Sequence, residues 1–239
     1  MPLFIKGNQV SSNDITSTGA FRSKINRDGL ICHLDAANIN SYPGSGTAWY
    51  DLSGNGNNGT INGSVTFSSS NNGVFTLPGS VGSYIDVPLN MASSNYTVIG
   101  SARYVTAVAG THANGQGGRI ISAKNNNWLM GHWLGTTENF YSEGWVTSSG
   151  TGATDTNWRI LSSSGNISED QYIMYVNGKI TVSNQGGSAG PNGFAIGLYG
   201  PGGTEYANGQ VGIFLVYNRV LNPFEIAEVY QATRGRYSI

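Results

Sequence analysis

The chain has 239 residues, with 35 glycines, one cysteine and a formal net charge of −1, and only 10 % of its residues are charged. This length suits one large all-β domain with a sizeable core, and the low charge and many glycines fit short strands joined by tight turns. Composition argues against general nucleic-acid binding, which needs a basic surface, and the lack of a long apolar run argues against membrane insertion.

Residues 1–28 are more polar and more basic than the rest of the chain. We expect a small hairpin about Gly7 and Asn8, and no signal peptide, because neither its apolar stretch nor its cleavage pattern is present. One interpretation is a loosely held tail, which is common at termini; the other, which we favour, is an arm that docks onto a neighbouring protein. The arm residues expected to make this contact are Phe4, Ile5, Phe21, Arg22, Lys24 and Arg27.

A single domain is expected over residues 29–239, because no linker stands out after Asp28. Its first strand, GLICHLDA, is apolar at odd and even positions and so predicts a strand buried on both faces. Cys32 lies in this strand among apolar neighbours, which favours a buried structural thiol over a nucleophile. Residues 49–52 predict a short strand or an ordered corner, and the Asn-Gly pairs in 54–63 predict tight reversals.

Further strands are expected where apolar and β-branched residues alternate between turn signals. Asn-Gly pairs recur between these segments at irregular spacing, which indicates successive antiparallel hairpins and not a sequence repeat. The expected strands cover residues 74–77, 83–87, 96–105, 119–123, 128–134, 139–146, 158–162, 171–176, 179–182 and 193–198.

The end of the chain carries the clearest local signals. Residues 211–217 are mostly apolar on both faces and predict a strand that is covered on both sides. A short helix should follow, with Asn222 as N-cap, Pro223 in the first turn and Glu225 completing a capping box. Glu228 is expected on the solvated surface of this helix.

Three pieces of sequence resemble a known family. They are WYDLSGNGNNGTINGSVTF at 49–67, YIMYVNGKITV at 172–182 and YNRVLNPFEI at 217–226, and they come in the family's order. Together they look like a laminin G-like domain of the concanavalin A-like superfamily, over residues 29–239. The resemblance implies an all-β, antiparallel jelly-roll β-sandwich, here with a short C-terminal helix and an N-terminal arm. Such domains occur in extracellular, adhesive and phage structural proteins.

Catalytic signatures are missing from the sequence. The Glu-x-Asp-x-x-Glu strand of concanavalin A-like glucanases is absent, and the adjacent Glu169 and Asp170 would point to opposite faces of a strand. No Gly-x-Ser-x-Gly or phosphate-loop motif occurs. His33, His112 and His132 lack the clustered spacing of a zinc site. We therefore predict a non-enzymatic protein.

Calcium is the one cofactor that the resemblance suggests, because related lectins and laminin G domains often bind it. Asp35, Asp51 and Asn55 are the candidate ligands, since their oxygens suit a hard cation. The alternative, which we favour, is that Asp51 organises an Asx-turn beside Ser53 and that Asp35 caps a loop.

Aromatic residues give the remaining functional signal. Trp128, Trp133, Tyr141 and Trp145 could line a glycan site, because sugars stack on exposed aromatic faces, or they could belong to the sandwich core, which we favour for most of them. Trp128 and Trp133 fall on opposite faces of one strand. One of the two is therefore expected in the core and the other at the surface.

Three functions are consistent with these observations. The first is a virion structural protein, on a capsid, tail or baseplate, assembled in the host cytoplasm as part of a homo- or hetero-oligomeric assembly and docked to other virion proteins through the arm. The second is an extracellular carbohydrate-binding adhesin or receptor-binding module that recognises cell-surface glycans. The third, ranked last, is a glycan hydrolase or lyase, which would need a carboxylate pair.

Overall fold

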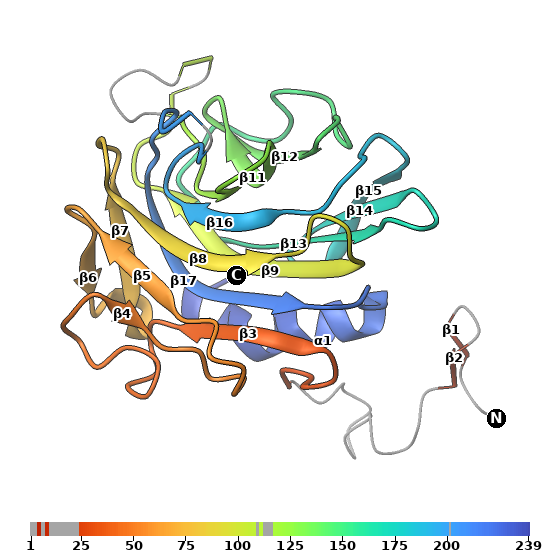
Figure 1. The fold of residues 1–239 in the computed structure, drawn as a ribbon, viewed down its shortest axis with the longest axis horizontal. Helices are drawn as coiled ribbons and strands as arrows, with labels where there is room; N and C mark the ends of the chain where they lie inside the picture. Colours follow the sequence, from red (N-terminus) through yellow and green to blue (C-terminus); the bar gives the residue numbers. More distant parts are fainter. Residues whose placement is uncertain (1–3, 6–7, 10–23, 109, 112–116, 201) are drawn as a thin grey trace.

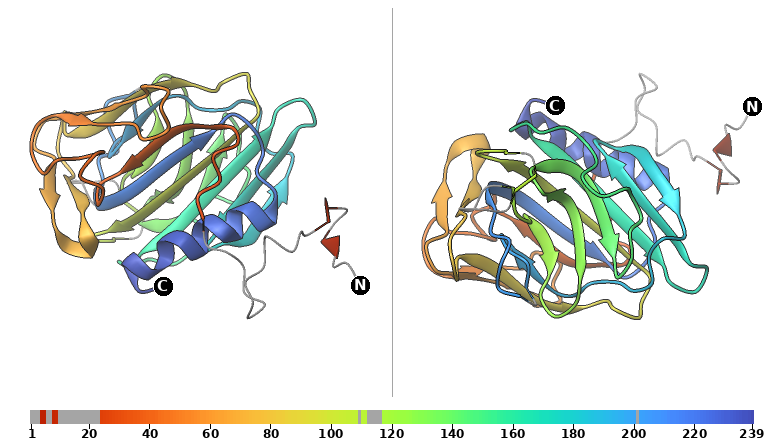
Figure 2. Two further views of the ribbon diagram at one scale, coloured as in Figure 1. Left: turned by 90° about the horizontal axis from the view of Figure 1, so that it is seen from below. Right: turned by 90° about the horizontal axis from the view of Figure 1, so that it is seen from above.

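The structure is a computed structural model, and it describes residues 4–5, 8–9, 24–108, 110–111, 117–200 and 202–239. In this part of the chain, two antiparallel sheets pack face to face, and an α-helix covers the outside of one of them (Figures 1 and 2). The predicted antiparallel β-sandwich with a short C-terminal helix is confirmed.

The eight-stranded sheet is built around the long strand β17 (Asn208–Tyr217). One edge of β17 pairs with β9 (Tyr96–Tyr104), and the other edge is shared by β7 (Val74–Pro78) and β3 (Leu30–Asp35). The sheet continues outward through β13 (Arg159–Asn166), β14 (Gln171–Val176) and β15 (Lys179–Asn184) on one side and β6 (Thr66–Ser68) on the other.

The second sheet has seven strands. Their order in space is β12 (Thr136–Ser142), β11 (Trp128–Trp133), β10 (Ile121–Ala123), β16 (Asn192–Ile196), β8 (Tyr84–Asn90), β5 (Gly59–Asn62) and β4 (Ala48–Trp49). The inner faces of the two sheets enclose the main core, where Trp128 packs edge-on against Phe140 and Phe194. Cys32 is fully buried in this core, as predicted, and burial raises the pKa of its thiol.

A second apolar cluster explains why β17 is apolar on both faces. Phe214 and Val216 point between the sheets, whereas Ile213, Leu215 and Tyr217 face outward under the helix α1 (Pro223–Thr233) and the 3₁₀ turn η3 (Arg234–Tyr237). Figure 2 shows α1 lying across this sheet. Burying both faces accounts for the continuous apolar run that the sequence displays.

Local capping signals are also confirmed. The Asn222 side chain accepts hydrogen bonds from Phe224 N (2.9 Å) and Glu225 N (3.0 Å), while Glu225 Oε2 accepts one from Asn222 N (2.9 Å). The prediction for Glu228 is wrong: this side chain is buried, with its Oε1 3.9 Å from Lys24 Nζ. Lys24 belongs to a segment that lies against the helix. The periodicity of the helix alone does not predict this contact, so it does not predict that Glu228 is buried.

Residues 24–28 contact the sandwich at the end of β17 and the start of α1. Asn26 Nδ2 donates to Glu225 Oε1 (2.8 Å), and the Tyr217 hydroxyl donates to the Asn26 carbonyl (3.0 Å). Asp28 pairs with Arg219 (3.1 Å), and Ile25 packs on the outer cluster. Of the predicted arm residues, Phe21 and Arg22 lie outside the described part of the chain. Contact of this arm with another protein stays a prediction.

Several strand boundaries differ from the sequence-based expectation. The hairpin about Gly7 is confirmed as pairing between β1 (Phe4–Ile5) and β2 (Asn8–Gln9). Strands β5 and β6 were not predicted, because the dense Asn-Gly pairs mask the short apolar segments between them. Strand β13 runs four residues past the expected end at Ser162, because its serines pair along β9 and β14.

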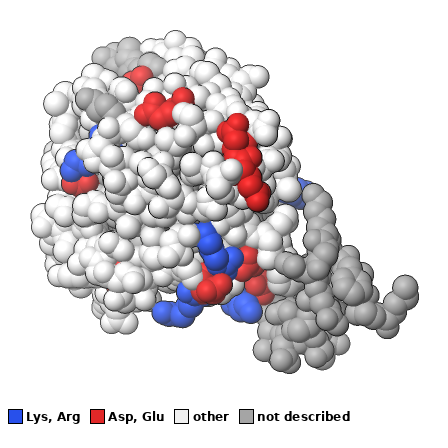
Figure 3. Space-filling view, turned by 45° about the vertical axis from the view of Figure 1, so that its right-hand side comes forward, with Lys and Arg blue, Asp and Glu red and all other residues white. Residues whose placement is uncertain are grey.

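Charge plays a small part in this surface. Most of the face in Figure 3 carries neither sign, as the 10 % content of charged residues leads one to expect. Within the described ranges, no helix is long and apolar enough to cross a membrane.

Candidate functional site

Three of the four aromatic residues singled out in the sequence meet on the outer face of the seven-stranded sheet. Trp133 ends β11, Tyr141 lies on β12, and Trp145 follows β12; all three are half-buried. The Trp145 ring lies 5.1 Å from that of Trp133 and 5.1 Å from that of Tyr141, between ring centroids. We call these three residues the aromatic cluster.

The chain reversal after β12 brings Trp145 back to Tyr141. Glu143 has φ of +53°, Ser142 N donates to Gly144 O (2.8 Å) and Val146 N donates to Phe140 O (3.0 Å). Asn184, just before the segment that leads to β16, donates its side chain to Val146 O. Because hydrogen bonds anchor the backbone on both sides of Trp145, its ring is held in place before any ligand arrives.

An ion pair between a buried arginine and a half-buried glutamate supports the cluster. Trp133 Nε1 donates to Glu205 Oε2 (3.1 Å), and Arg119 Nε donates to the same oxygen (2.6 Å). Arg119 is itself buried; it donates to Asn127 Oδ1 (2.7 Å), and its guanidinium lies over the Tyr199 ring at 4.2 Å. Because one oxygen of Glu205 accepts both hydrogen bonds, it fixes the Trp133 indole and its charge neutralises the arginine.

Trp128, the fourth predicted residue, does not belong to this site. Its side chain is fully buried between the sheets, and its Nε1 donates to the Tyr96 hydroxyl (3.0 Å). It has no exposed face on which a sugar could stack. The division of the two tryptophans of β11 into one core residue and one half-exposed residue follows the expected alternation.

All three calcium candidates make hydrogen bonds or ion pairs within the chain. Asp51 accepts hydrogen bonds from His33 N, Ser53 N, Ser53 Oγ and Asn57 N at 2.7–3.0 Å. Burial raises the pKa of its carboxyl, but these hydrogen bonds outweigh that effect and hold the pKa below its usual value. Asp35 pairs with Arg236 (2.7 Å), and Asn55 donates to Leu30 O and Ser53 Oγ. This geometry supports the turn interpretation.

Histidine chemistry receives no support from the arrangement. His132 is fully buried, and His33 lies on β3 with its pKa lowered by burial. His112 lies outside the described part of the chain. Among the residues that the structure describes, no group of three or more His, Cys, Asp or Glu side chains is placed to hold a metal ion.

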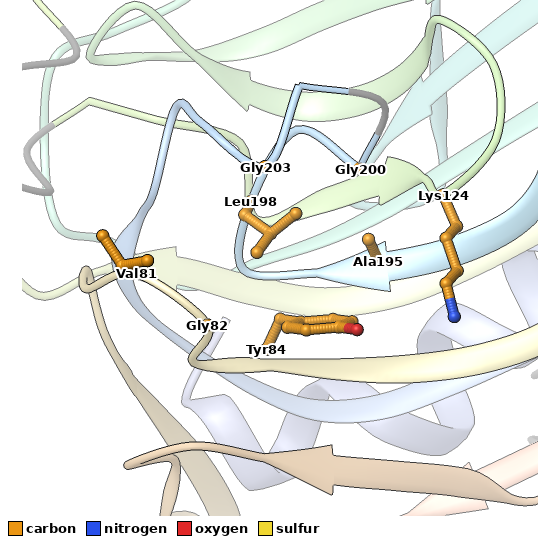
Figure 4. A pocket seen from close by; sticks show the side chains of 8 residues that line it. All are labelled: Val81, Gly82, Tyr84, Lys124, Ala195, Leu198, Gly200 and Gly203. Atoms are coloured by element: carbon orange, nitrogen blue, oxygen red, sulfur yellow. The ribbon is translucent and has the colours of Figure 1, made fainter.

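A pocket of about 280 Å³ opens on the same sheet, over β8 and β16 (Figure 4). Its lining combines apolar side chains, glycines and one cation: Val81, Gly82, Tyr84, Lys124, Ala195, Leu198, Gly200 and Gly203. Lys124 is ion-paired with Asp86. Sequence reasoning missed this pocket and the pair Arg119–Glu205. Their residues come from distant segments, and only the strand register brings them together.

Comparison with known proteins shows similarity in fold. No family model matches the sequence, and no curated protein matches it. Among solved structures, the binding domain of Paraclostridial Mosquitocidal Protein 1 aligns with a TM-score of 0.62 and 17 % identity, over 85 % of this chain and 52 % of that one. Domain 4 of AbnA, a GH43 extracellular arabinanase from Geobacillus stearothermophilus, in complex with arabinotriose, gives 0.61 and 19 %, over 84 % of this chain and 98 % of that one.

A Trypanosoma rangeli sialidase in complex with sialic acid gives a TM-score of 0.66 and 14 % identity, over 94 % of this chain and 36 % of the sialidase. The chain thus spans about half of the toxin binding domain and about a third of the sialidase. At these identities the likeness shows the fold alone, because one fold hosts many functions. It supports the expected antiparallel β-sandwich and does not show a phage origin. The predicted virion role, localisation and partners stay predictions.

Proposed function

We propose that the chain is a non-catalytic carbohydrate-binding module whose ligand stacks on the aromatic cluster. The observation that carries this proposal is the meeting of Trp133, Tyr141 and Trp145 on one outer sheet face, each only half-buried. Aromatic residues in a core hide their faces, whereas these keep part of each ring in water. A sugar ring offers the flat apolar C–H surface that such faces bind.

The charges near the cluster favour a neutral sugar. Glu143 is exposed beside Tyr141, and Glu205 contacts Trp133, whereas the cation Arg119 is buried and paired. Since Arg119 already neutralises Glu205, an anionic sugar at the cluster would meet the exposed carboxylate of Glu143, which would repel it. Binding of neutral glycans therefore fits this surface better than binding of sialylated or uronate-containing ones.

The similar folds support this proposal without deciding it. One of the similar domains is described in complex with arabinotriose, so arabinan is a reasonable first polysaccharide to test. A catalytic role is not proposed, because Glu205, a carboxylate in contact with the cluster, is already bound by Arg119 and Trp133.

The test is electrophoresis of the full chain through gels containing arabinan, xylan, β-1,3-glucan, soluble cellulose derivatives or a sialylated glycoprotein. We expect retardation by at least one neutral polysaccharide. Replacing Trp145 by Ala should weaken that retardation roughly fivefold or more, because a stacked aromatic ring contributes on the order of 1 kcal/mol or more. Trp145→Phe should retain most of it.

Tyr50→Ala is the matched control, because Tyr50 is also an exposed aromatic residue (47 %) but lies outside the cluster. Unchanged binding in Tyr50→Ala together with lost binding in Trp145→Ala supports the site. Equal retardation of Trp145→Ala and the unmodified chain, or no retardation of the unmodified chain by any polysaccharide, would overturn the proposal.

A further inference from the structure

The register of the seven-stranded sheet links the aromatic cluster to the pocket. Tyr141 on β12 is paired with Leu129, and the row continues through Ser122, Ala195 and Asp86 on the next strands. These residues share the outer face, because their chain neighbours point between the sheets: Phe140, Met130, Ile121, Phe194 and Ile85. One row therefore runs from the cluster to the pocket residue Ala195 and to Asp86, beside Tyr84.

The length of this row exceeds what one sugar can cover. Neighbouring strands lie about 4.8 Å apart, so the three steps from Tyr141 to Ala195 span roughly 14 Å, and the fourth step to Asp86 brings the distance to roughly 19 Å. A single sugar ring bound at the cluster leaves the pocket empty. An oligosaccharide can reach both.

A partly exposed aromatic residue lies between the two ends. The middle of the row is covered, since Ser122 has no exposed surface and Gly200 packs directly on the backbone of Ala123 and Lys124. Tyr199, next to Gly200, is half-buried, and its ring is stacked on Arg119, which also binds the Glu205 that holds Trp133. A ligand that crosses this segment therefore meets a further aromatic residue between the cluster and Tyr84.

The pocket has the features of a sugar subsite. Figure 4 shows it between β8, which carries Tyr84, and the segment with Leu198, Gly200 and Gly203. Tyr84 offers an aromatic surface, and glycines in the lining let a ligand approach the backbone closely. The Lys124–Asp86 pair supplies donors and acceptors without a net charge, which suits hydroxyl groups.

We propose that the module binds an extended, neutral oligosaccharide, with one part on the aromatic cluster and another in the Tyr84 pocket, and not a single terminal sugar. This inference rests on the proposed function, and it goes further by naming the ligand as an internal stretch of a glycan chain. The aromatic cluster, Tyr199 and Tyr84 are the aromatic positions along its path.

The test is calorimetry of the full chain with oligosaccharides of increasing length, from disaccharide to octasaccharide. Arabino-oligosaccharides and the β-1,3- and β-1,4-linked glucose series are the probes. We expect affinity to rise with length until the pocket is filled and then to level off. Tyr84→Ala should weaken binding of the longest member roughly three- to tenfold and leave the shortest binding member unchanged. Trp145→Ala should weaken binding at every length.

The outcomes separate this inference from the proposal on which it rests. Equal affinity at all lengths, or a Tyr84→Ala variant with unchanged affinity for the longest member, overturns the two-part site even when Trp145→Ala still loses binding. If no member of any series binds the unmodified chain, both the inference and the carbohydrate-binding function fail. Tyr50→Ala again controls for the loss of an exposed aromatic ring.

Discussion

His132 on β11 has a fully buried imidazole whose ring centroid lies 4.7 Å from that of Tyr104. In the structure neither ring nitrogen has a hydrogen-bond partner. Burial lowers its pKa from an ordinary value of 6.5 to about 3, and the nearby Arg159 acts in the same direction. As the pH falls, the His132 imidazole is therefore protonated in the unfolded chain at a higher pH than in the folded chain. The stability that depends on neutral His132 is full above pH 6.5 and falls as the pH drops toward 3.

We predict that the free energy of unfolding falls by about 2 kcal/mol between pH 7.5 and pH 5 through this residue. Urea denaturation of the unmodified chain and of His132→Leu, across this range, measures it. His33 contributes in the same direction in both proteins, so the difference in slope isolates His132. The same pH slope in both proteins would contradict the prediction. Carboxylates such as Asp155, with a pKa of about 2, titrate below this range.

At the scale of elements, two glycines allow the segment after β12 to meet the segment that precedes β16. A Cβ on Gly186 would collide with the carbonyl oxygen of Trp145, and one on Gly144 would collide with the carbonyl oxygen of Gly186. The backbone beside Trp145 therefore depends on these positions having no side chain. This packing places the Trp145 ring against Trp133 and Tyr141.

We predict that Gly186→Ala destabilises the fold by about 1–3 kcal/mol and also weakens glycan binding, because it displaces Trp145 without removing it. Gly235→Ala is the matched control: nothing lies within 4 Å of a Cβ at that position. Thermal unfolding, tryptophan fluorescence and gel retardation are the measurements. Unchanged fluorescence and retardation in Gly186→Ala would show that this contact does not position Trp145.

Elements with strong local signals were predictable, and those that depend on long-range register were not. The capping box at Asn222 and the two-sided apolarity of β17 are written in adjacent residues, so helix and strand follow directly from the sequence. The aromatic cluster was half predictable: strand alternation separates Trp128 from Trp133, but only the reversal after β12 brings Trp145 to Trp133 and Tyr141. The Tyr84 pocket gives no local signal, because it depends on the pairing of β16 with β8.

At the scale of the whole molecule, the helix side and the candidate binding face belong to different sheets. The helix α1 covers the eight-stranded sheet. Residues 24–28 lie on the same side of the molecule: Asn26 contacts the helix, Ile25 packs on the outer cluster, and Asp28 pairs with Arg219 between β17 and α1. The aromatic cluster and the pocket lie on the seven-stranded sheet. Changes at the start of the sandwich should therefore affect stability and leave glycan binding intact.

We predict that a chain covering residues 29–239 is less stable than one covering 24–239 by roughly 2–4 kcal/mol. The shorter chain loses the Asn26–Glu225 and Tyr217–Asn26 hydrogen bonds and the packing of Ile25, each of which contributes on the order of 1 kcal/mol. Urea denaturation of the two chains gives the difference. Equal stabilities would mean that residues 24–28 do not belong energetically to the sandwich. Equal glycan affinity of the two chains would agree with the separation of the two faces, and a loss of affinity in the shorter chain would contradict it.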